Sequence, residues 1–339
     1  MLEAAGRNLL DPVILFFVLG VLAGLIRSNL EMPQPIAKFL SLYLLVAIGL
    51  KGGTTLAVEG LSASGAMAVL AALIMAVSVP IITYGVLKRL VDPFNAAAVA
   101  GTYGSVSAVT FIAAQQFLDK NGIPFGGYMT VAMVLMETPA IILAVTLVTL
   151  LRAKQAVAPV SLSAAAADQP SVIPALSIGR VVYEALTYGG HVLLVGSLVI
   201  GFVAGAPGQD AIRPLFSDLF KGILAFFLLD MGLLVGRQFG DAEFRLEYVL
   251  TAFALIAPPL YGSLALLLAR VFALAQGDAV LLAALSASAS YIVVPAILRY
   301  AVPEARPGIY FTMALGLTFP FNIIAGIPLY HAISELLWR

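Results

Sequence analysis

Two serine-rich stretches largely determine how this chain folds: Ala100-Gly-Thr-Tyr-Gly-Ser-Val-Ser-Ala-Val-Thr110 and Leu285-Ser-Ala-Ser-Ala-Ser-Tyr-Ile-Val-Val-Pro295. Each lies within an apolar segment that contains no charged residue, one from Pro93 to Leu118 and the other from Ala279 to Leu298. Glycine tolerates non-helical backbone, and Pro295 lacks the amide hydrogen that a regular helix needs. We therefore predict two helices that cross a membrane and are broken near its middle.

The composition is that of an integral membrane protein. Of the 339 residues, 61% are apolar and 11% are charged, whereas soluble domains contain about 25% charged residues. Eighteen Lys and Arg balance eighteen Asp and Glu, so no charge excess indicates nucleic acid as a partner. With no cysteine and only two histidines, His191 and His331, the chain has few residues from which to build a haem or zinc centre.

Ten segments satisfy the criterion for a membrane-spanning helix, which is about 20 residues of low charge to cross about 30 Å of hydrocarbon. They cover residues 12–27, 36–57, 64–87, 94–118, 126–151, 186–205, 217–237, 248–272, 278–299 and 308–337. The predicted fold class is therefore an all-α integral membrane protein. Glu3 and Asp11 argue against a cleavable signal peptide, so we expect the first helix to remain.

The two halves of the chain resemble each other. When the sequence is shifted against itself by 181 residues, small and helix-breaking residues coincide: Gly20 with Gly201, Gly24 with Gly205, Arg89 with Arg270, Ser105 with Ser286, Ser107 with Ser288, Gly127 with Gly308 and Pro139 with Pro320. We predict a first five-helix repeat at residues 1–151, a linker at 152–180 and a second repeat at 181–339. Because five is odd, the second repeat is inverted in the membrane, as in many secondary transporters.

Lys and Arg are unequally distributed over the two sides of this arrangement. One side carries eleven of them: Arg27, Lys38, Lys88, Arg89, Arg152, Lys154, Arg180, Arg237, Arg245, Arg299 and Arg306. The other side carries seven: Arg7, Lys51, Lys120, Arg213, Lys221, Arg270 and Arg339. The positive-inside rule places the first set in the cytoplasm. We therefore expect both termini outside and the linker inside.

The two broken helices provide a candidate site for a small anion. If they cross head to head, their amino ends direct unpaired N–H groups and partial positive charge at one point, where an oxyanion binds without Lys or Arg. The predicted substrate-binding residues are small or carry hydroxyl groups: Gly104, Ser105, Ser107, Ser286, Ser288 and Ser290. The alternative for each is close packing between membrane helices.

Glu137 is the clearest charge at membrane depth, in Leu135-Met-Glu-Thr-Pro-Ala-Ile141. Charges there are costly and mark function by default. Pro139 loosens the helix and exposes carbonyl oxygens, which are the ligands that Na⁺ needs beside a carboxylate. The predicted sodium ligands are Thr102, Glu137, Thr318 and Asn322. The alternative is a neutral Glu137 that donates one structural hydrogen bond.

Two further charges lie in equivalent helices of the two halves, Lys51 in the second span and Asp230 in the seventh. One hypothesis is that they pair across the repeat axis. The alternative is that Lys51, beside Gly52 and Gly53, extends its side chain to the membrane surface.

Three stretches, Tyr103-Gly-Ser-Val-Ser-Ala-Val-Thr-Phe111, Met136-Glu-Thr-Pro-Ala-Ile141 and Ser288-Ala-Ser-Tyr-Ile-Val-Val-Pro295, resemble the cyanobacterial sodium-dependent bicarbonate transporter family. The resemblance covers nearly the whole chain. It implies a homotrimer in which a core domain moves against a gate domain, Na⁺-coupled bicarbonate uptake, and a PII-like regulator on the cytoplasmic face. Two residues depart from the family pattern, since Tyr291 replaces an acidic residue and Glu137 replaces an Asp.

The leading hypothesis is a Na⁺-driven symporter that imports bicarbonate across the bacterial plasma membrane and needs no organic cofactor. Because Tyr291 replaces an acid, another small carboxylate or organic anion stays open as the substrate. A passive anion channel is the less favoured alternative. An enzyme is not expected, because no His or Cys lies at a span centre beside the serines to activate a nucleophile.

Overall fold

The computed structural model describes residues 11–60, 62–157, 183, 187, 189–239, 247–291 and 293–339. Every regular element within these residues is a helix. The predicted all-α class is therefore confirmed. The predicted linker lies outside the described residues, except for 152–157, which continue a helix.

The helices follow the chain in two halves. The first half contains α2 (Pro12–Leu25), α3 (Gln34–Glu59), α4 (Ala63–Leu87), α5 (Pro93–Gly104), α6 (Ala108–Lys120) and α7 (Tyr128–Val157). The second half contains α9 (Gly189–Arg213), η1 (Pro214–Asp218), α10 (Phe220–Phe239), α11 (Tyr248–Val271), α12 (Gln276–Ser286), α13 (Val293–Ala301), α14 (Pro307–Phe311), η2 (Thr312–Thr318), α15 (Phe319–Phe321), η3 (Asn322–Gly326) and α16 (Ile327–Leu337). Seven helical stretches of the described chain are long and apolar enough to cross a membrane, which makes this a multi-pass membrane protein. The full count of ten spans and the inverted repeat stay predictions.

Local sequence explains where several of these helices begin. The Asp11 carboxylate accepts a hydrogen bond from the Val13 amide at 3.0 Å, directly before the first turn of α2. The Asp92 carboxylate likewise accepts from the Phe94 amide at 3.0 Å, and Pro93 occupies the first position of α5. A carboxylate cap followed by proline is a favourable helix start, because proline has no amide hydrogen to leave unsatisfied.

Both serine-rich stretches break a helix, as predicted. α5 ends at Gly104 and α6 begins at Ala108, while α12 ends at Ser286 and α13 begins at Val293. Each half of one broken helix packs against a half of the other: α6 packs against α12, and α5 packs against α13. The breaks therefore face each other.

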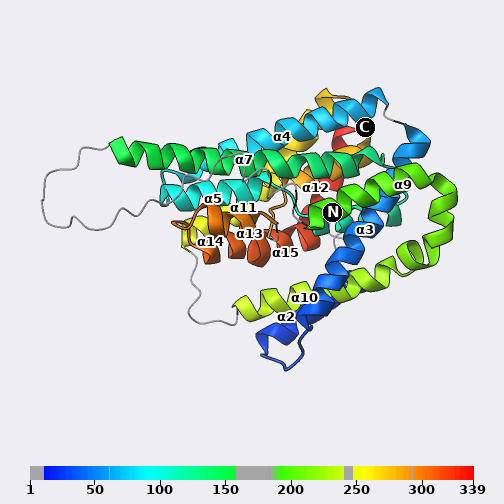
Figure 1. The fold of residues 1–339 in the computed structure, drawn as a ribbon, viewed down its shortest axis with the longest axis horizontal. Coiled ribbons are helices and arrows are strands. Elements are labelled where there is room, and N and C mark those ends of the chain that lie inside the picture. Colours follow the sequence, from blue (N-terminus) through cyan, green and yellow to red (C-terminus); the bar gives the residue numbers. More distant parts are fainter. Residues whose placement is uncertain are drawn as a thin grey trace, which may run out of the picture.

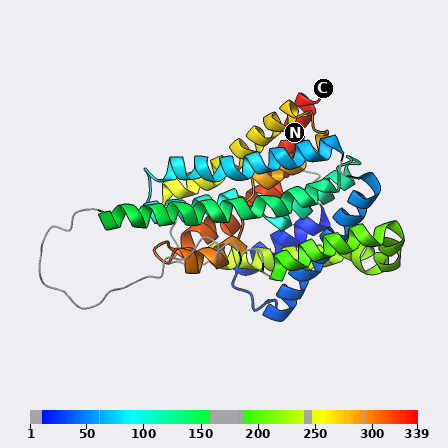
Figure 2. The same ribbon diagram turned by 45° about the horizontal axis from the view of Figure 1, so that its top comes forward.

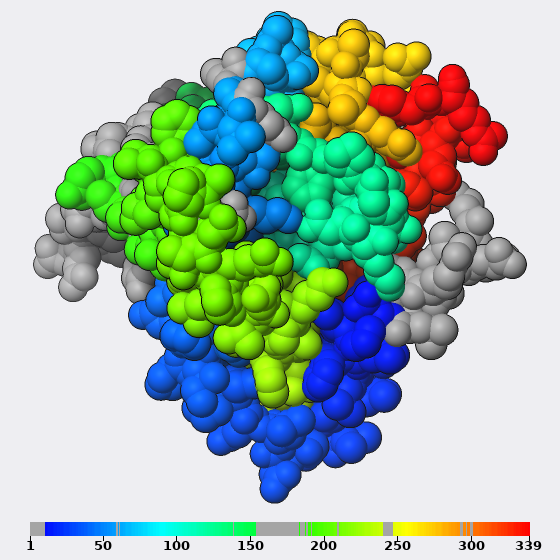
Figure 3. Space-filling model, turned by 90° about the vertical axis from the view of Figure 1, so that its right-hand side faces the viewer, coloured from blue at the N-terminus to red at the C-terminus, as the bar shows by residue number. Residues whose placement is uncertain are grey.

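The helices form two groups (Figures 1 and 2). In the four-helix group, which consists of α2, α3, α9 and α10, α2 packs along α10 and α3 packs along α9. The broken-helix group consists of α4 to α7 and α11 to α16, with α4 packed on α5 and α7, and α11 packed on α12. Figure 3 shows the four-helix group from one side, where dark-blue α2 lies beside yellow-green α10.

The carboxyl end of α7 extends beyond the predicted end of this span at residue 151 and reaches Val157. Arg152 fixes this end, because its guanidinium lies 2.8 Å from the Glu304 carboxylate and donates to the Ala301 carbonyl at 3.1 Å. The hydrogen bonds from Arg152 hold the pKa of Glu304 below its ordinary value. α7 is thereby tied to the loop between α13 and α14.

The last apolar segment is wound differently from the regular helix that its composition predicts. It runs without a break from Pro307 to Leu337, but η2 and η3 on either side of Pro320 are π-helical. Proline removes a regular backbone hydrogen bond, and π-helical turns are frequent at functional sites. Thr318 and Asn322 lie in these two turns.

Glycines allow the helices of the four-helix group to approach backbone to backbone. A Cβ atom on Gly24 of α2 would lie 2.7 Å from the Leu233 carbonyl oxygen of α10. On the other pair, a Cβ atom on Gly49 of α3 would lie 2.7 Å from the Leu194 carbonyl oxygen of α9. Small residues at such crossings let membrane helices pack closely, and Gly24 and Gly49 serve this use.

The substitution Gly24→Ala should therefore destabilise the protein, because the added methyl group meets backbone that cannot move aside. We expect a loss of about 1–3 kcal/mol, the usual cost of overpacking, seen as a lower midpoint of thermal unfolding in detergent. Gly85→Ala in α4 is the matched control, because a Cβ atom there meets nothing within 4 Å. Equal midpoints for the two variants would contradict the packing described here.

Candidate functional site

A cavity of about 720 Å³ lies where the four-helix group meets the broken-helix group. Apolar side chains of α3, α9 and α10 form much of its wall. Its polar lining comes from Lys38 and Ser41 of α3, Ser107 at the start of α6, Glu137 of α7, Asp230 of α10, and Ser290 and Tyr291 in the break before α13. The cavity therefore brings both breaks together with two carboxylates.

Ser107 and Ser288 join the two breaks. The Ser107 amide donates to the Ser288 hydroxyl at 2.9 Å, and that hydroxyl donates to the Leu285 carbonyl at 2.7 Å. The Ser107 hydroxyl accepts from the Thr110 amide at 3.2 Å and so caps the amino end of α6. Serine in both roles lets each break satisfy backbone groups that a membrane interior would otherwise leave without partners.

Ser290 caps the amino end of α13 in the same way. Its hydroxyl accepts from the Val294 amide at 3.3 Å, and its own amide donates to the Thr102 carbonyl of α5 at 2.9 Å. Ser107 and Ser290 thus stand at the amino ends of α6 and α13, and both line the cavity. Two helix amino ends contribute partial positive charge and N–H groups to its inner wall.

The other predicted substrate-binding residues do not line the cavity. Gly104 faces α4, because a Cβ atom there would lie 2.7 Å from the ring of Pro80. Ser105 and Ser286 are buried, and their hydroxyl groups have no hydrogen-bond partner among the described residues. Ser288 is occupied by the bonds just described.

The predicted sodium ligands also divide into one residue that lines the cavity and three that do not. Glu137 is half-buried and lines the cavity. The other three residues are buried away from the cavity lining and hydrogen-bonded. These bonds join Thr102 to the Ala98 carbonyl at 2.9 Å, Thr318 to the Tyr103 hydroxyl at 2.6 Å, and the Asn322 amide to the Ala287 carbonyl at 2.8 Å.

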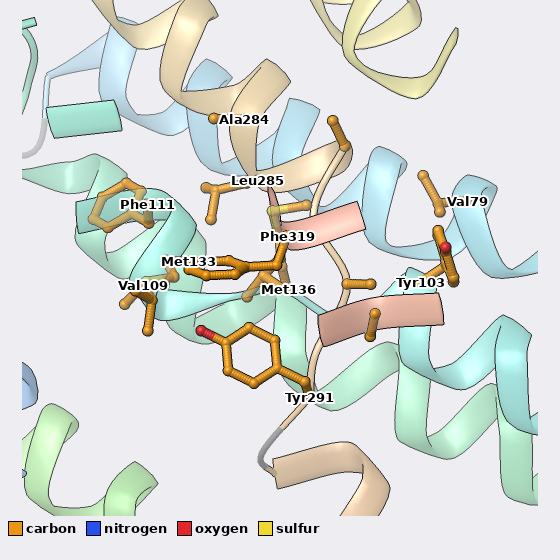
Figure 4. Packing of buried hydrophobic residues seen from close by; sticks show 14 of the residues in the cluster. Val79, Tyr103, Val109, Phe111, Met133, Met136, Ala284, Leu285, Tyr291 and Phe319 are labelled. Carbon is orange, nitrogen blue, oxygen red and sulfur yellow. The ribbon is translucent and has the colours of Figure 1, made fainter. Parts of the chain in front are cut away.

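Tyr291, in the break before α13, lies at the wall of the cavity. Figure 4 shows its hydroxyl directed toward Val109 and Met133, two residues that also line the cavity. Its ring packs edge-on against Phe319, with the centroids 5.3 Å apart. Ser107 is a polar neighbour of the hydroxyl, but no hydrogen bond of ordinary geometry joins the two within the described chain.

The pairing of Lys51 with Asp230 is not formed, so that hypothesis is wrong. The Lys51 ammonium lies 2.8 Å from the Asp119 carboxylate at the end of α6 and 5.3 Å from the centre of the Phe125 ring. Its side chain is 45% exposed. The alternative reading of Lys51 as a side chain that reaches the surface agrees with this placement, whereas Asp230 faces the cavity.

Lys38 and Ser41 of α3 line the cavity but are not among the predicted site residues. Their only sequence signal is weak: Lys38 and Lys51 are the two bases of an otherwise uncharged segment, and Ser41 follows Lys38 at helical spacing. Which face of α3 meets the breaks depends on packing between distant segments.

Ser288→Ala should destabilise the crossing, because it leaves the buried Ser107 amide without its acceptor. An unsatisfied buried donor costs about 1–3 kcal/mol, so we expect a clearly lower midpoint of thermal unfolding in detergent. Ser286→Ala is the matched control, since the hydroxyl it removes has no partner among the described residues. If Ser286→Ala proves as harmful as Ser288→Ala, the hydrogen bond is not what holds the breaks together.

The chain matches a known family over nearly its full length. The model of the Na⁺-dependent bicarbonate transporter superfamily matches residues 12–335. No curated protein matches the chain. The matched range contains both breaks and every residue of the cavity lining. The family consists of membrane transporters, so the expectation that the chain is not an enzyme is confirmed.

Proposed function

We propose that this chain, which belongs to the Na⁺-dependent bicarbonate transporter superfamily, imports bicarbonate together with Na⁺ as a symporter. The observation that carries the proposal is the cavity in which the amino ends of α6 and α13 meet the carboxylate of Glu137. Helix amino ends suit an oxyanion, and a carboxylate suits a cation. The same cavity thus provides binding groups for both the anion and the cation.

The anion is held by backbone and hydroxyl groups rather than by a base. Neither break contains Lys or Arg, and the hydroxyl groups of Ser107 and Ser290 stand at the two helix ends. The Tyr291 hydroxyl adds a hydrogen-bond donor beside them. Gly104, Ser105, Ser286 and Ser288 serve this site indirectly, by shaping the crossing of the helices.

Glu137 is the anchor that we propose for Na⁺. Thr102, Thr318 and Asn322 use their side chains to hold α5, η2 and the α12 break in place, so they reach Na⁺ only in another conformation. A cation at Glu137 offsets the charge of the entering anion in a cavity with mostly apolar walls. This attraction links uptake of the two ions.

Transport by an elevator-type movement requires the broken-helix group, as the core, to slide against the four-helix group, as the gate. Two ion pairs span this interface away from the cavity: Lys51 with Asp119, and Asp11 with Lys120, each at 2.8 Å. The second pair lies near the amino end of α10, whereas the cavity is lined by its middle, from Phe227 to Leu234. The pairs close one end of the interface while the other end holds the cavity.

The remaining features of the proposal come from charge counts and from the family resemblance. The positive-inside rule places both termini outside a bacterial plasma membrane and the linker in the cytoplasm. The cavity is lined by the amino ends of α3 and α9, which lie on the linker side in this topology. We further propose a homotrimer and a PII-like regulator at the cytoplasmic face.

A second substrate class is favoured by the size of the cavity. At about 30 Å³ per water molecule, 720 Å³ exceeds what a bicarbonate ion needs. A small carboxylate with an apolar part would also contact the walls of α3 and α9. It would use the same helix ends, so competition between anions separates the two candidates.

Purified protein in liposomes should take up labelled bicarbonate only when a Na⁺ gradient points inward. Glu137→Gln should raise the Na⁺ concentration for half-maximal uptake by about tenfold or more, because it removes the charge that binds the cation. Glu335→Gln at the far end of α16 is the control. Equal uptake without Na⁺ would exclude coupling, and uptake that is competed only by organic acids would favour the second substrate class.

The chain has no native cysteine, which permits a direct test of the movement. In the variant Lys51→Cys with Asp119→Cys, a cleavable thiol cross-linker should join α3 to α6 and stop transport, and cleavage should restore it. Each single variant treated in the same way should keep its uptake. Full transport by the cross-linked protein would show that this interface stays closed throughout the cycle.

A further inference from the structure

Asp230 is a buried carboxylate to which the proposed Na⁺ site gives no role. It lies in α10 within Leu228-Leu-Asp-Met-Gly232, is 7% exposed, and lines the cavity. No residue in the described part of the chain makes a hydrogen bond or an ion pair with it. A carboxylate in this state at membrane depth is costly unless a proton or a cation neutralises it.

The charged groups around Asp230 do not remove this cost. Arg237 follows on the same helix about 10 Å away along the axis, and its guanidinium donates to the Leu30 carbonyl at 2.8 Å. Lys38 of α3 and Glu137 of α7 line the same cavity. Before any cation binds, the lining thus carries two carboxylates against one ammonium group, a balance that repels an entering anion.

We propose that Asp230 binds a monovalent cation, either Na⁺ or a proton, whose presence is required before the anion enters. This inference rests on the proposed transport function and adds a cation site on the gate side of the cavity. The Ser41 hydroxyl of α3 lines the same cavity and offers a neutral oxygen for the cation. With Na⁺ at Glu137 and a cation at Asp230, Lys38 leaves the lining with a net positive charge, which attracts the anion.

The position of Asp230 assigns it a function that differs from that of Glu137. Glu137 belongs to the broken-helix group and would travel with the anion, whereas Asp230 belongs to α10 of the four-helix group. Its cation is bound where the two groups meet. Release of that cation restores the negative charge of Asp230. This charge then disfavours return of the anion to the part of the cavity beside α10.

The test compares the wild type with Asp230→Asn, which keeps the volume of the side chain and removes its charge. Asp218→Asn is the matched control, because Asp218 is 60% exposed and lies 3.6 Å from Arg213. Binding of radioactive sodium to the purified protein is measured without any anion. Bicarbonate uptake is then measured at fixed bicarbonate and Na⁺ concentrations, from mildly acidic to mildly alkaline pH.

If the cation is Na⁺, Asp230→Asn should bind sodium at least about tenfold more weakly or bind one sodium fewer, whereas Asp218→Asn should match the wild type. If it is a proton, sodium binding should be unchanged and the pH dependence of uptake should be lost. Unchanged sodium binding together with an unchanged pH profile would overturn the inference. A wild type that binds sodium through Asp230 yet imports no bicarbonate would instead refute the proposed substrate.

Discussion

The rest of this structure depends on one constraint: a helix broken within a membrane must find partners for its freed backbone groups inside the protein. Water is absent there, and each unsatisfied group is expensive. The chain meets the constraint by placing two breaks against each other. The Ser107 amide binds the Ser288 hydroxyl, and the Ser290 amide binds the Thr102 carbonyl. Each break thus supplies a hydrogen-bond acceptor for a backbone amide of the other.

The same bonds support the anion site that we propose. Because Ser107 and Ser290 cap α6 and α13 beside the cavity, the positive ends of both helices reach it without a basic side chain in either break. A Lys or Arg at this point would hold an anion strongly and would release it slowly. Backbone and hydroxyl dipoles bind more weakly, which suits a site that must both take up and release its substrate.

The sequence predicted those parts of the fold that local chemistry fixes. The breaks follow from glycine, serine and proline in uncharged segments, and the all-helical class follows from the length and low charge of the apolar segments. The sequence could not predict which serines face the cavity, because helical periodicity does not continue across a break. The partners of Thr318 and Asn322 lie on distant segments, and so does the ion pair of Lys51 with Asp119. These depend on packing that no local pattern encodes.

Packing also explains why the proposed movement falls between the two groups of helices and not within them. Within the four-helix group, Gly24 and Gly49 bring backbones so close that any sliding would drive side chains into carbonyl groups. Between the groups lie the cavity and the two ion pairs, whose side chains are partly exposed and whose separation costs about 0–1 kcal/mol each. Weak ion pairs at one end and the cavity at the other therefore support the proposed movement at this interface, with each glycine-packed pair of helices moving as a unit.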